Sequence, residues 1–149
     1  MAVLIRAACD PGQIEGAQFN ASDFSSDVDA GEVFQNQDTV YFAYGKAVPG
    51  DVVAGDLTVS PDHTIAGFED IFYGVSKCPL ATVTGASNVV GGISFAVGDD
   101  VFIDLTSATL ATTKETDNAY IGKAVTAKAA TASTFIMNFD GTNPSRTSS

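Results

Sequence analysis

The sequence predicts an all-β fold, a single β-sandwich or barrel domain with an extended N-terminal arm. From residue 40 onward, short runs of β-branched and aromatic residues are separated by turn residues at intervals of roughly 8–12 residues. Helix-type periodicity is weak along the chain. The length of 149 residues and the hydrophobic content of 45% suit one packed domain. We therefore divide the chain into an arm (1–40), a β-domain (41–142) and a disordered C-terminal tail (143–149).

The first forty residues have too few apolar side chains to form a core of their own. They contain seven acidic residues and one basic residue, and their phenylalanines stand isolated among Gly, Asn, Gln, Ser and Asp. Ordering such a segment costs backbone entropy that it cannot offset by itself. We expect it to order on contact with a neighbouring protomer or another protein, and a flexible terminus is the alternative. The candidate contact residues are Phe19, Phe24, Phe34, Asp27 and Asp29.

The β-domain is predicted to consist of strands along its whole length. The predicted strands are 39–44, 51–60 with a break at 54–55, 70–75, 80–83, 93–97, 101–105, 119–127 and 134–139. Alternation within them assigns faces, because successive strand residues point to opposite sides. Segment 124–132 is the best helix candidate, and its threonines favour a single turn instead. The predicted core comprises Val53, Leu57, Val59, Ile71, Phe72, Val75, Phe95, Val101, Ile103, Ile121, Phe135 and Met137.

Gly-Asp steps mark the turns that precede several strands. They occur at Pro49-Gly50-Asp51, Gly55-Asp56 and Gly98-Asp99-Asp100. Glycine accepts the positive φ of tight turns, and aspartate can accept hydrogen bonds from nearby backbone amides. A calcium loop would need alternating acids and a terminal glutamate, which these steps lack. We interpret them as turns.

The charge balance excludes two classes of partner. A net charge of −11 disfavours binding to nucleic acid or to an anionic membrane, and no apolar run approaches the ~20 residues of a membrane helix. The opening MAVLIRAACD is too short for a secretion signal. From residue 105 onward, four basic residues outnumber three acids. The acidic N-terminal third could pair with this part or with a neighbouring copy, and a solvated acidic face is the alternative.

Residues typical of catalytic sites are sparse, and we expect no enzyme, no cofactor and no metal site. His63 is the only histidine, and no G-x-S-x-G or phosphate loop occurs. Asp99 and Asp100 are adjacent on a strand and therefore point to opposite faces. Cys9 and Cys78 lack metal-ligand spacing and are expected to be free thiols, with a single bridge as the alternative.

Five motifs together support a family resemblance. They are Pro49-Gly50-Asp51 with Gly55-Asp56, IFYGV at 71–75, GISFAVGDDVFID at 92–104, AYIGKA at 119–124 and FIMNF at 135–139. In this order and spacing, Val48 to Gly141 resembles the small capsid decoration, or cement, proteins of tailed bacteriophages. The resemblance covers about two-thirds of the chain. Residues 1–47 are longer than the lead-in of that family, so it implies nothing about the arm.

The resemblance implies a homotrimer that binds the outer surface of a phage capsid and staples neighbouring major capsid proteins, stabilising the head. Its partners would be the major capsid protein and copies of itself. Its location would be the virion, after synthesis in the host cytoplasm. It implies no catalytic residues.

A glycan- or receptor-binding β-module on a virion or cell surface is the alternative. Such a module would need an exposed cluster of tyrosines in a concave site. Tyr41, Tyr44, Tyr73 and Tyr120 instead lie on predicted strands, which favours core or interface positions.

Overall fold

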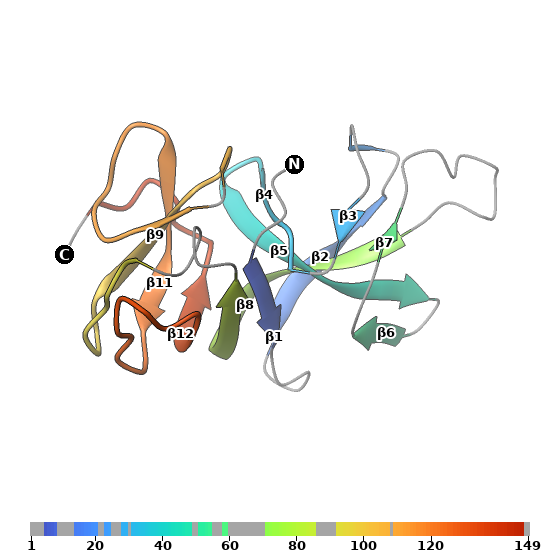
Figure 1. Ribbon diagram of the computed structural model, residues 1–149. Coiled ribbons are helices and arrows are strands. Elements are labelled where there is room, and N and C mark those ends of the chain that lie inside the picture. The colour runs from blue at the N-terminus through green and yellow to red at the C-terminus, as the bar shows by residue number, and fades with distance from the viewer. Residues whose placement is uncertain are drawn as a thin grey trace.

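The computed structural model describes residues 5–8, 14–20, 23–24, 28–29, 31–48, 51–54, 58–59, 71–85, 92–107 and 109–147. This part of the chain is nearly all β, which confirms the predicted fold class. One antiparallel sheet curls into a half-barrel, and a small two-stranded sheet lies beside it (Figure 1). Within these residues, no helix is long and apolar enough to cross a membrane.

In the described part of the chain, twelve strands make up the two sheets. They are β1 (Ile5–Ala8), β2 (Glu15–Asn20), β3 (Val28–Asp29), β4 (Val33–Asn36), β5 (Thr39–Val48), β6 (Asp51–Ala54), β7 (Thr58–Val59), β8 (Ile71–Gly85), β9 (Asp100–Asp104), β10 (Leu110–Ala111), β11 (Asn118–Ala124) and β12 (Thr134–Asp140). Strands β3 and β7 form the small sheet, and the others form the large one.

The long strand β8 organises the large sheet because other strands flank both of its edges. In its first half, Val75 pairs with a residue of β2 and with a residue of β5. In its second half, Thr84 pairs with a residue of β1 and with a residue of β12. Lys77 pairs with both β2 and β12. Strands β1 and β2 therefore follow each other along one edge of β8, and β12 and β5 lie along the other.

The two halves of the sheet continue outward from β12 and β5. Beyond β12 the order is β11, β9 and β10, and beyond β5 lie β4 and β6. Gly141, directly after β12, joins the halves through its backbone. Its amide donates to the Ser76 carbonyl at 2.9 Å, and its carbonyl accepts from the Val40 amide at 2.8 Å. The halves thus curve around a shared interior.

The main core fills this interior, and its side chains come from alternate residues of both halves. Strand β12 shows the pattern: Phe135, Met137 and Phe139 are buried while Asn138 is exposed. The burial predicted for core residues is confirmed for Phe72, Val75, Phe95, Val101, Ile103, Ile121, Phe135 and Met137. Ile71 is only half-buried. Leu57 and the side chains of Val53 and Val59 lie outside the described residues.

A second, smaller core lies on the opposite face of β4, β5 and β8. Val28, Phe34, Ala43 and Phe72 are buried in it, and Phe19, Phe24 and Tyr41 pack against them. Alternation accounts for this arrangement, since Phe34 and Ala43 point away from the main core while Val33 and Phe42 point into it. Apolar residues therefore occupy both faces of this half of the sheet.

The described strands of the N-terminal arm (residues 1–40) pair with strands of the β-domain. Strand β2 pairs with β8, and β4 forms a hairpin with β5 across the boundary placed at residue 40. The segment supplies no core alone, but its aromatic side chains complete the second core on a sheet built by later residues. The C-terminal segment also packs, because the Pro144 carbonyl accepts from the Tyr120 amide at 3.0 Å. The predicted tail from residue 143 stays a prediction, and its described residues include this hydrogen bond to β11.

Several local predictions are confirmed and others need correction. The predicted strands 70–75 and 80–83 are parts of the single strand β8, and the predicted strand 93–97 is reduced to one bridge between Phe95 and Lys128. Segment 124–132 forms turns rather than a helix. At the predicted turn before β9, Gly98 has φ +88°, and the Asp99 carboxylate accepts from the Ala96 amide at 2.9 Å.

The expectation of free thiols is wrong for Cys78. Its side chain is 1% exposed in the main core and is disulfide-bonded. Cys9 lies outside the described residues. The expectation of two thiols rested on the rarity of disulfides in intracellular proteins, and the local sequence does not show that Cys78 is buried in the sheet interior.

Candidate functional site

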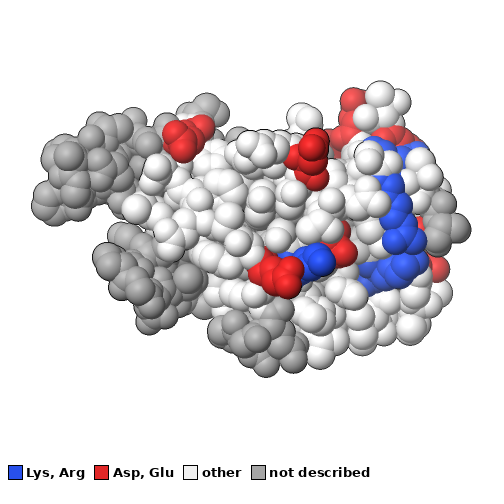
Figure 2. Space-filling model, turned by 180° about the vertical axis from the view of Figure 1, so that it is seen from behind, with Lys and Arg blue, Asp and Glu red and all other residues white. Residues whose placement is uncertain are grey.

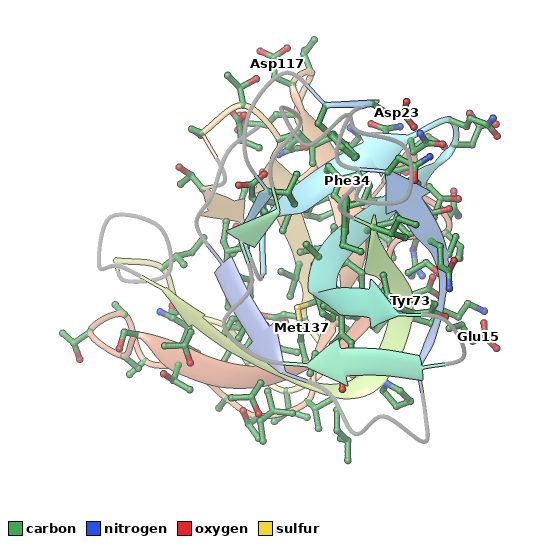
Figure 3. The ribbon with its side chains drawn as sticks, turned by 90° about the vertical axis from the view of Figure 1, so that its right-hand side faces the viewer. Glu15, Asp23, Phe34, Tyr73, Asp117 and Met137 are labelled. Atoms are coloured by element: carbon green, nitrogen blue, oxygen red, sulfur yellow. The ribbon has the colours of Figure 1, made fainter. Side chains whose placement is uncertain are left out.

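The three phenylalanines predicted as contact residues come together in the second core. The ring of Phe19 lies 6.4 Å from that of Phe24 and 5.0 Å from that of Phe34, measured between centroids. Phe34 is buried and points inward, whereas Glu15 and Asp23 lie at the periphery (Figure 3). Phe19 and Phe24 are half-buried and leave part of their rings at the surface. Packing on their own sheet therefore brings these residues together.

The two acids predicted as contact residues cannot be assigned a surface from the structure. Asp29 lies in β3, where its backbone pairs with Thr58 of β7, and its side chain lies outside the described residues. Asp27 and His63 also lie outside them. The contact roles of Asp27 and Asp29 stay predictions.

A charged cluster joins β9, β11 and the C-terminal segment. The Lys123 ammonium donates to the Asp100 carboxylate at 2.8 Å, and the Arg146 guanidinium lies 3.9 Å from the same oxygen. Arg146 also lies 4.6 Å above the ring of Tyr120 and donates to its hydroxyl at 3.3 Å. One buried carboxylate thus holds two cations, and one of these anchors the end of the described chain.

Burial changes the titration of two groups near this end of the molecule. It raises the pKa of the Tyr120 phenol above its usual 10.0, against the lowering effect of the charges on Arg146 and Lys123. Burial lowers the pKa of the Lys128 ammonium, which donates to the carbonyls of Ile93 and Ala129. Lys128 thereby ties the loop before β9 to the turn after β11. Both groups serve the fold rather than an exposed site.

The basic side chains are unevenly distributed over the surface. Among described side chains other than Lys77 and the buried Lys128, the basic residues are Lys114, Lys123 and Arg146. Figure 2 shows most of the visible Lys and Arg in one strip at the end of the molecule that carries β9 and β11. A smaller group of basic and acidic atoms lies near the middle of this view, and most of the remaining described surface is uncharged. The charge asymmetry predicted from the sequence therefore has a spatial counterpart.

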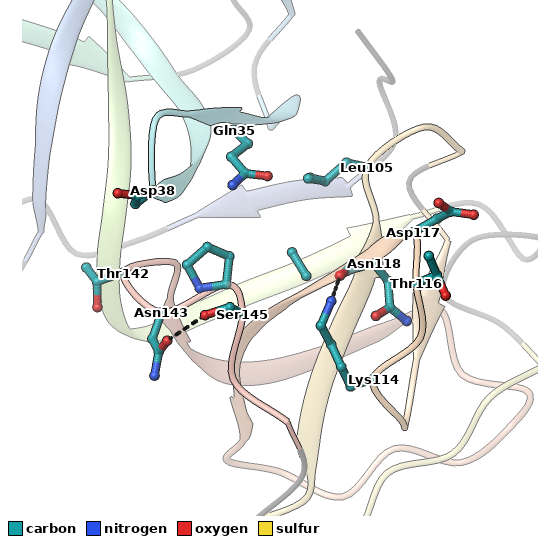
Figure 4. A pocket seen from close by; sticks show the side chains of 12 residues that line it. Gln35, Asp38, Leu105, Lys114, Thr116, Asp117, Asn118, Thr142, Asn143 and Ser145 are labelled. Carbon is teal, nitrogen blue, oxygen red and sulfur yellow. Dashed lines mark hydrogen bonds between the residues drawn. The ribbon is translucent and has the colours of Figure 1, made fainter.

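A polar pocket of about 430 Å³ lies between the β4–β5 hairpin and the C-terminal segment. Figure 4 shows Gln35 and Asp38 on one side and Lys114, Asp117 and Asn118 on the other. The remaining lining residues are Leu105, Thr116, Ala119, Thr142, Asn143, Pro144 and Ser145. No aromatic side chain is present in this described lining.

Hydrogen bonds within residues 113–118 hold the loop that separates this pocket from a neighbouring hollow. The Asn118 side chain accepts from the Glu115 amide at 2.8 Å and donates to the Thr113 carbonyl at 3.0 Å. The Lys114 ammonium donates to the Asn118 carbonyl. These groups are engaged in holding the loop, so they contribute shape rather than reactive chemistry to the pocket. The neighbouring hollow has about 560 Å³ and shares Thr116, Asp117 and Asn118 with it.

Residue types typical of metal sites and catalytic pairs do not converge in the described part of the chain. No group of three His, Cys, Asp or Glu side chains there could hold a metal ion. Asp99 is exposed and caps a turn, while Asp100 is buried against Lys123. Asp99 lies in the turn before β9 and not on the strand with Asp100, so the expected position of both residues on one strand is wrong, and the two carboxylates have different environments.

Sequence reasoning missed the Asp100 cluster and the pocket. The sequence did contain a partial signal, because Lys114, Lys123 and Arg146 fall in the one part of the chain where basic residues outnumber acids. Which carboxylate the cations would meet depends on the pairing of β9 with β11, where Lys123 lies opposite Asp100. That pairing joins residues 23 positions apart.

Comparisons with known proteins add no relative: no protein-family model, no curated protein and no solved structure matches this chain.

Proposed function

We propose that this chain is a structural virion protein that binds the outer surface of a tailed-phage capsid as a homotrimer and staples neighbouring major capsid proteins. The observation that carries the proposal is the set of five motifs resembling capsid decoration proteins. In an all-β fold, the described residues of these motifs occupy positions that determine one sheet. The motifs therefore share a structural purpose, which gives the resemblance more weight than their separate letters do.

Two motif glycines illustrate this purpose. Gly98 takes φ +88° at the turn into β9, and Gly122 takes φ +135° within β11. A Cβ at Gly122 would lie 1.9 Å from the Asn138 carbonyl oxygen of β12, so only glycine fits between these strands. The AYIGKA and FIMNF motifs are thus complementary parts of one strand pair.

A trimer suits the proposed role for a physical reason. A capsid presents many local three-fold positions, and a protein of matching symmetry makes three linked contacts there. Each further contact forms at high effective concentration once the first has formed. The partly exposed rings of Phe19 and Phe24 are the contact residues that we retain for this surface, because aromatic residues are enriched at binding hot spots.

Two measurements test the proposal, the molar mass of the chain in solution and its binding to capsids. Light scattering on the purified chain should give three times the monomer mass, and the chain should co-sediment with empty capsids of the phage that encodes it. Replacing Phe24 with alanine should weaken co-sedimentation, whereas Gln18→Ala, an exposed change on β2, should not. A monomer at micromolar concentration that does not sediment with those capsids would contradict the proposal.

The glycan- or receptor-binding alternative has one favourable observation, the polar pocket with its amide, hydroxyl and carboxylate groups. The tyrosines do not support it, since Tyr44 and Tyr120 are buried and Tyr41 and Tyr73 are half-buried. A glycan array separates the two functions. Binding to a defined sugar that Asp38→Ala abolishes, without binding to capsids, would favour the alternative.

A further inference from the structure

The position of Cys78 indicates a covalent link that concerns the N-terminal strand. Cys78 is 1% exposed and disulfide-bonded, and the chain contains one other cysteine, Cys9. Strand β1 ends at Ala8, which pairs with Thr82. Cys9 is therefore the next residue after the strand that covers this edge of β8.

The course of the chain along β8 supports the same partner. Strand β1 leaves the edge of β8 at Thr82, and β2 rejoins the same edge at Lys77. The chain between them must connect these two points, and Cys78 lies between them on β8. Cys78 thus lies on the stretch of β8 between the last pair of β1 and the first pair of β2, and Cys9 directly follows β1 in the sequence.

We propose that a disulfide between Cys9 and Cys78 fastens β1 to β8 and that the chain reaches full stability only after oxidation. Strand β1 has four residues and pairs only with β8 among the described strands, and such short segments open locally at low free-energy cost. A crosslink between residues so far apart removes conformations from the unfolded chain. This inference does not depend on the proposed function.

The crosslink would also protect a sheet edge. With β1 in place, residues 82–84 of β8 are paired on both sides, by β1 and by β12. Loss of β1 would leave their outward N–H and C=O groups unpaired, and such edges recruit strands from other chains. The oxidised chain should therefore resist self-association through this edge better than the reduced chain.

The chemistry requires an oxidant, which we take to be a small-molecule disulfide such as oxidised glutathione. One cysteine thiolate attacks a sulfur of the oxidant, giving a mixed disulfide and one released thiolate. The second cysteine thiolate then displaces the other oxidant thiolate and forms the protein disulfide. Two cysteines are oxidised and one oxidant disulfide is reduced to two thiols. Since Cys78 is buried, exchange must take place before β1 has closed or while it is open.

The test compares the full chain, oxidised with glutathione disulfide or reduced, with the variants Cys9→Ser and Cys78→Ser. Intact mass and thiol titration of the denatured chain should show an intramolecular disulfide in the oxidised wild type alone. Reduction should lower the wild-type Tm by roughly 5–15 °C. The Tm of Cys9→Ser should lie near that of the reduced wild type. This Tm should not change when reductant is added, so the variant controls for effects of the reductant itself.

Hydrogen exchange locates the effect. Reduction should accelerate exchange of the β1 amides at least tenfold and leave the amides of β9 and β11 unchanged, because these strands lie on the other side of β12. Two free thiols in the oxidised, folded chain would overturn the proposal. So would a disulfide that links two chains, or a wild-type Tm that reduction leaves unchanged.

Discussion

Replacing Phe34 with alanine should lower the free energy of unfolding by about 3–5 kcal/mol, the usual cost of removing a buried phenylalanine ring. Phe34 is 5% exposed at the centre of the second core. Its ring centroid lies 5.0 Å from that of Phe19, 5.2 Å from that of Phe24 and 5.7 Å from that of Phe72. Its ring also stacks on that of Tyr41, with 5.5 Å between the centroids. The substitution therefore removes contacts to four other rings at once.

The environment of Phe34 argues that the cavity would persist. The ring lies directly over Gly74, where an added Cβ would come within 3.0 Å of its Cζ atom. Glycine has no side chain that could move into the vacated space, so the loss should fall in the upper part of that range. Because a domain of this size loses roughly 2–4 °C of Tm per kcal/mol, the Tm should drop by roughly 6–20 °C.

Urea unfolding followed by circular dichroism measures the effect, with thermal melting as a second readout. Gln35→Ala is the matched control, since Gln35 is the next residue of β4 and is exposed, and it should change stability by less than about 0.5 kcal/mol. A loss below about 1 kcal/mol for Phe34→Ala would refute the reasoning. The aromatic cluster would then not be packed in the free protein, and the original hypothesis of an arm that orders on a partner would regain its basis.

Three further predictions concern the other half of the sheet. Phe135→Ala should cost about 3–5 kcal/mol in urea unfolding, because the ring is 3% exposed, and a loss below about 1 kcal/mol would place it at the surface. Gly122→Ala should abolish folding or cost more than about 2 kcal/mol, whereas Gly92→Ala, at φ +80° but with open space around it, should cost about 1 kcal/mol in the same melt. Burial favours the neutral form of the Tyr120 phenol and raises its pKa above 10.0. The contribution of the neutral phenol to the free energy of unfolding is therefore complete below pH 10.0 and is lost as the pH rises through the raised pKa. Ultraviolet titration should show a late phenol step that Tyr120→Phe removes, and an unchanged titration would contradict it.

The local sequence pattern was sufficient to predict a strand and its turn where neighbouring residues determine both. The alternation of Phe135, Met137 and Phe139 predicts which face of β12 is buried, because a strand has a period of two regardless of its partner. The turn at Gly98 and Asp99 is equally local, since a positive φ and a short side-chain hydrogen bond need no distant residue. These features fix the all-β class and much of the core.

Only the tertiary structure decided how distant segments meet. Glu32 counted as one of the acids of a solvated arm, yet its side chain is fully buried. Phe19 and Phe34 are too sparse to form a core by themselves and become part of one on the outer face of β5 and β8. The engagement of Asp100 by two cations, and of Cys78 in a disulfide, likewise depends on pairings across long stretches of chain. The physical reason is that the burial of a side chain and the choice of its contact partners depend on the assembled sheet, in which residues far apart in sequence become neighbours. A local pattern can specify a strand without specifying which residues cover it.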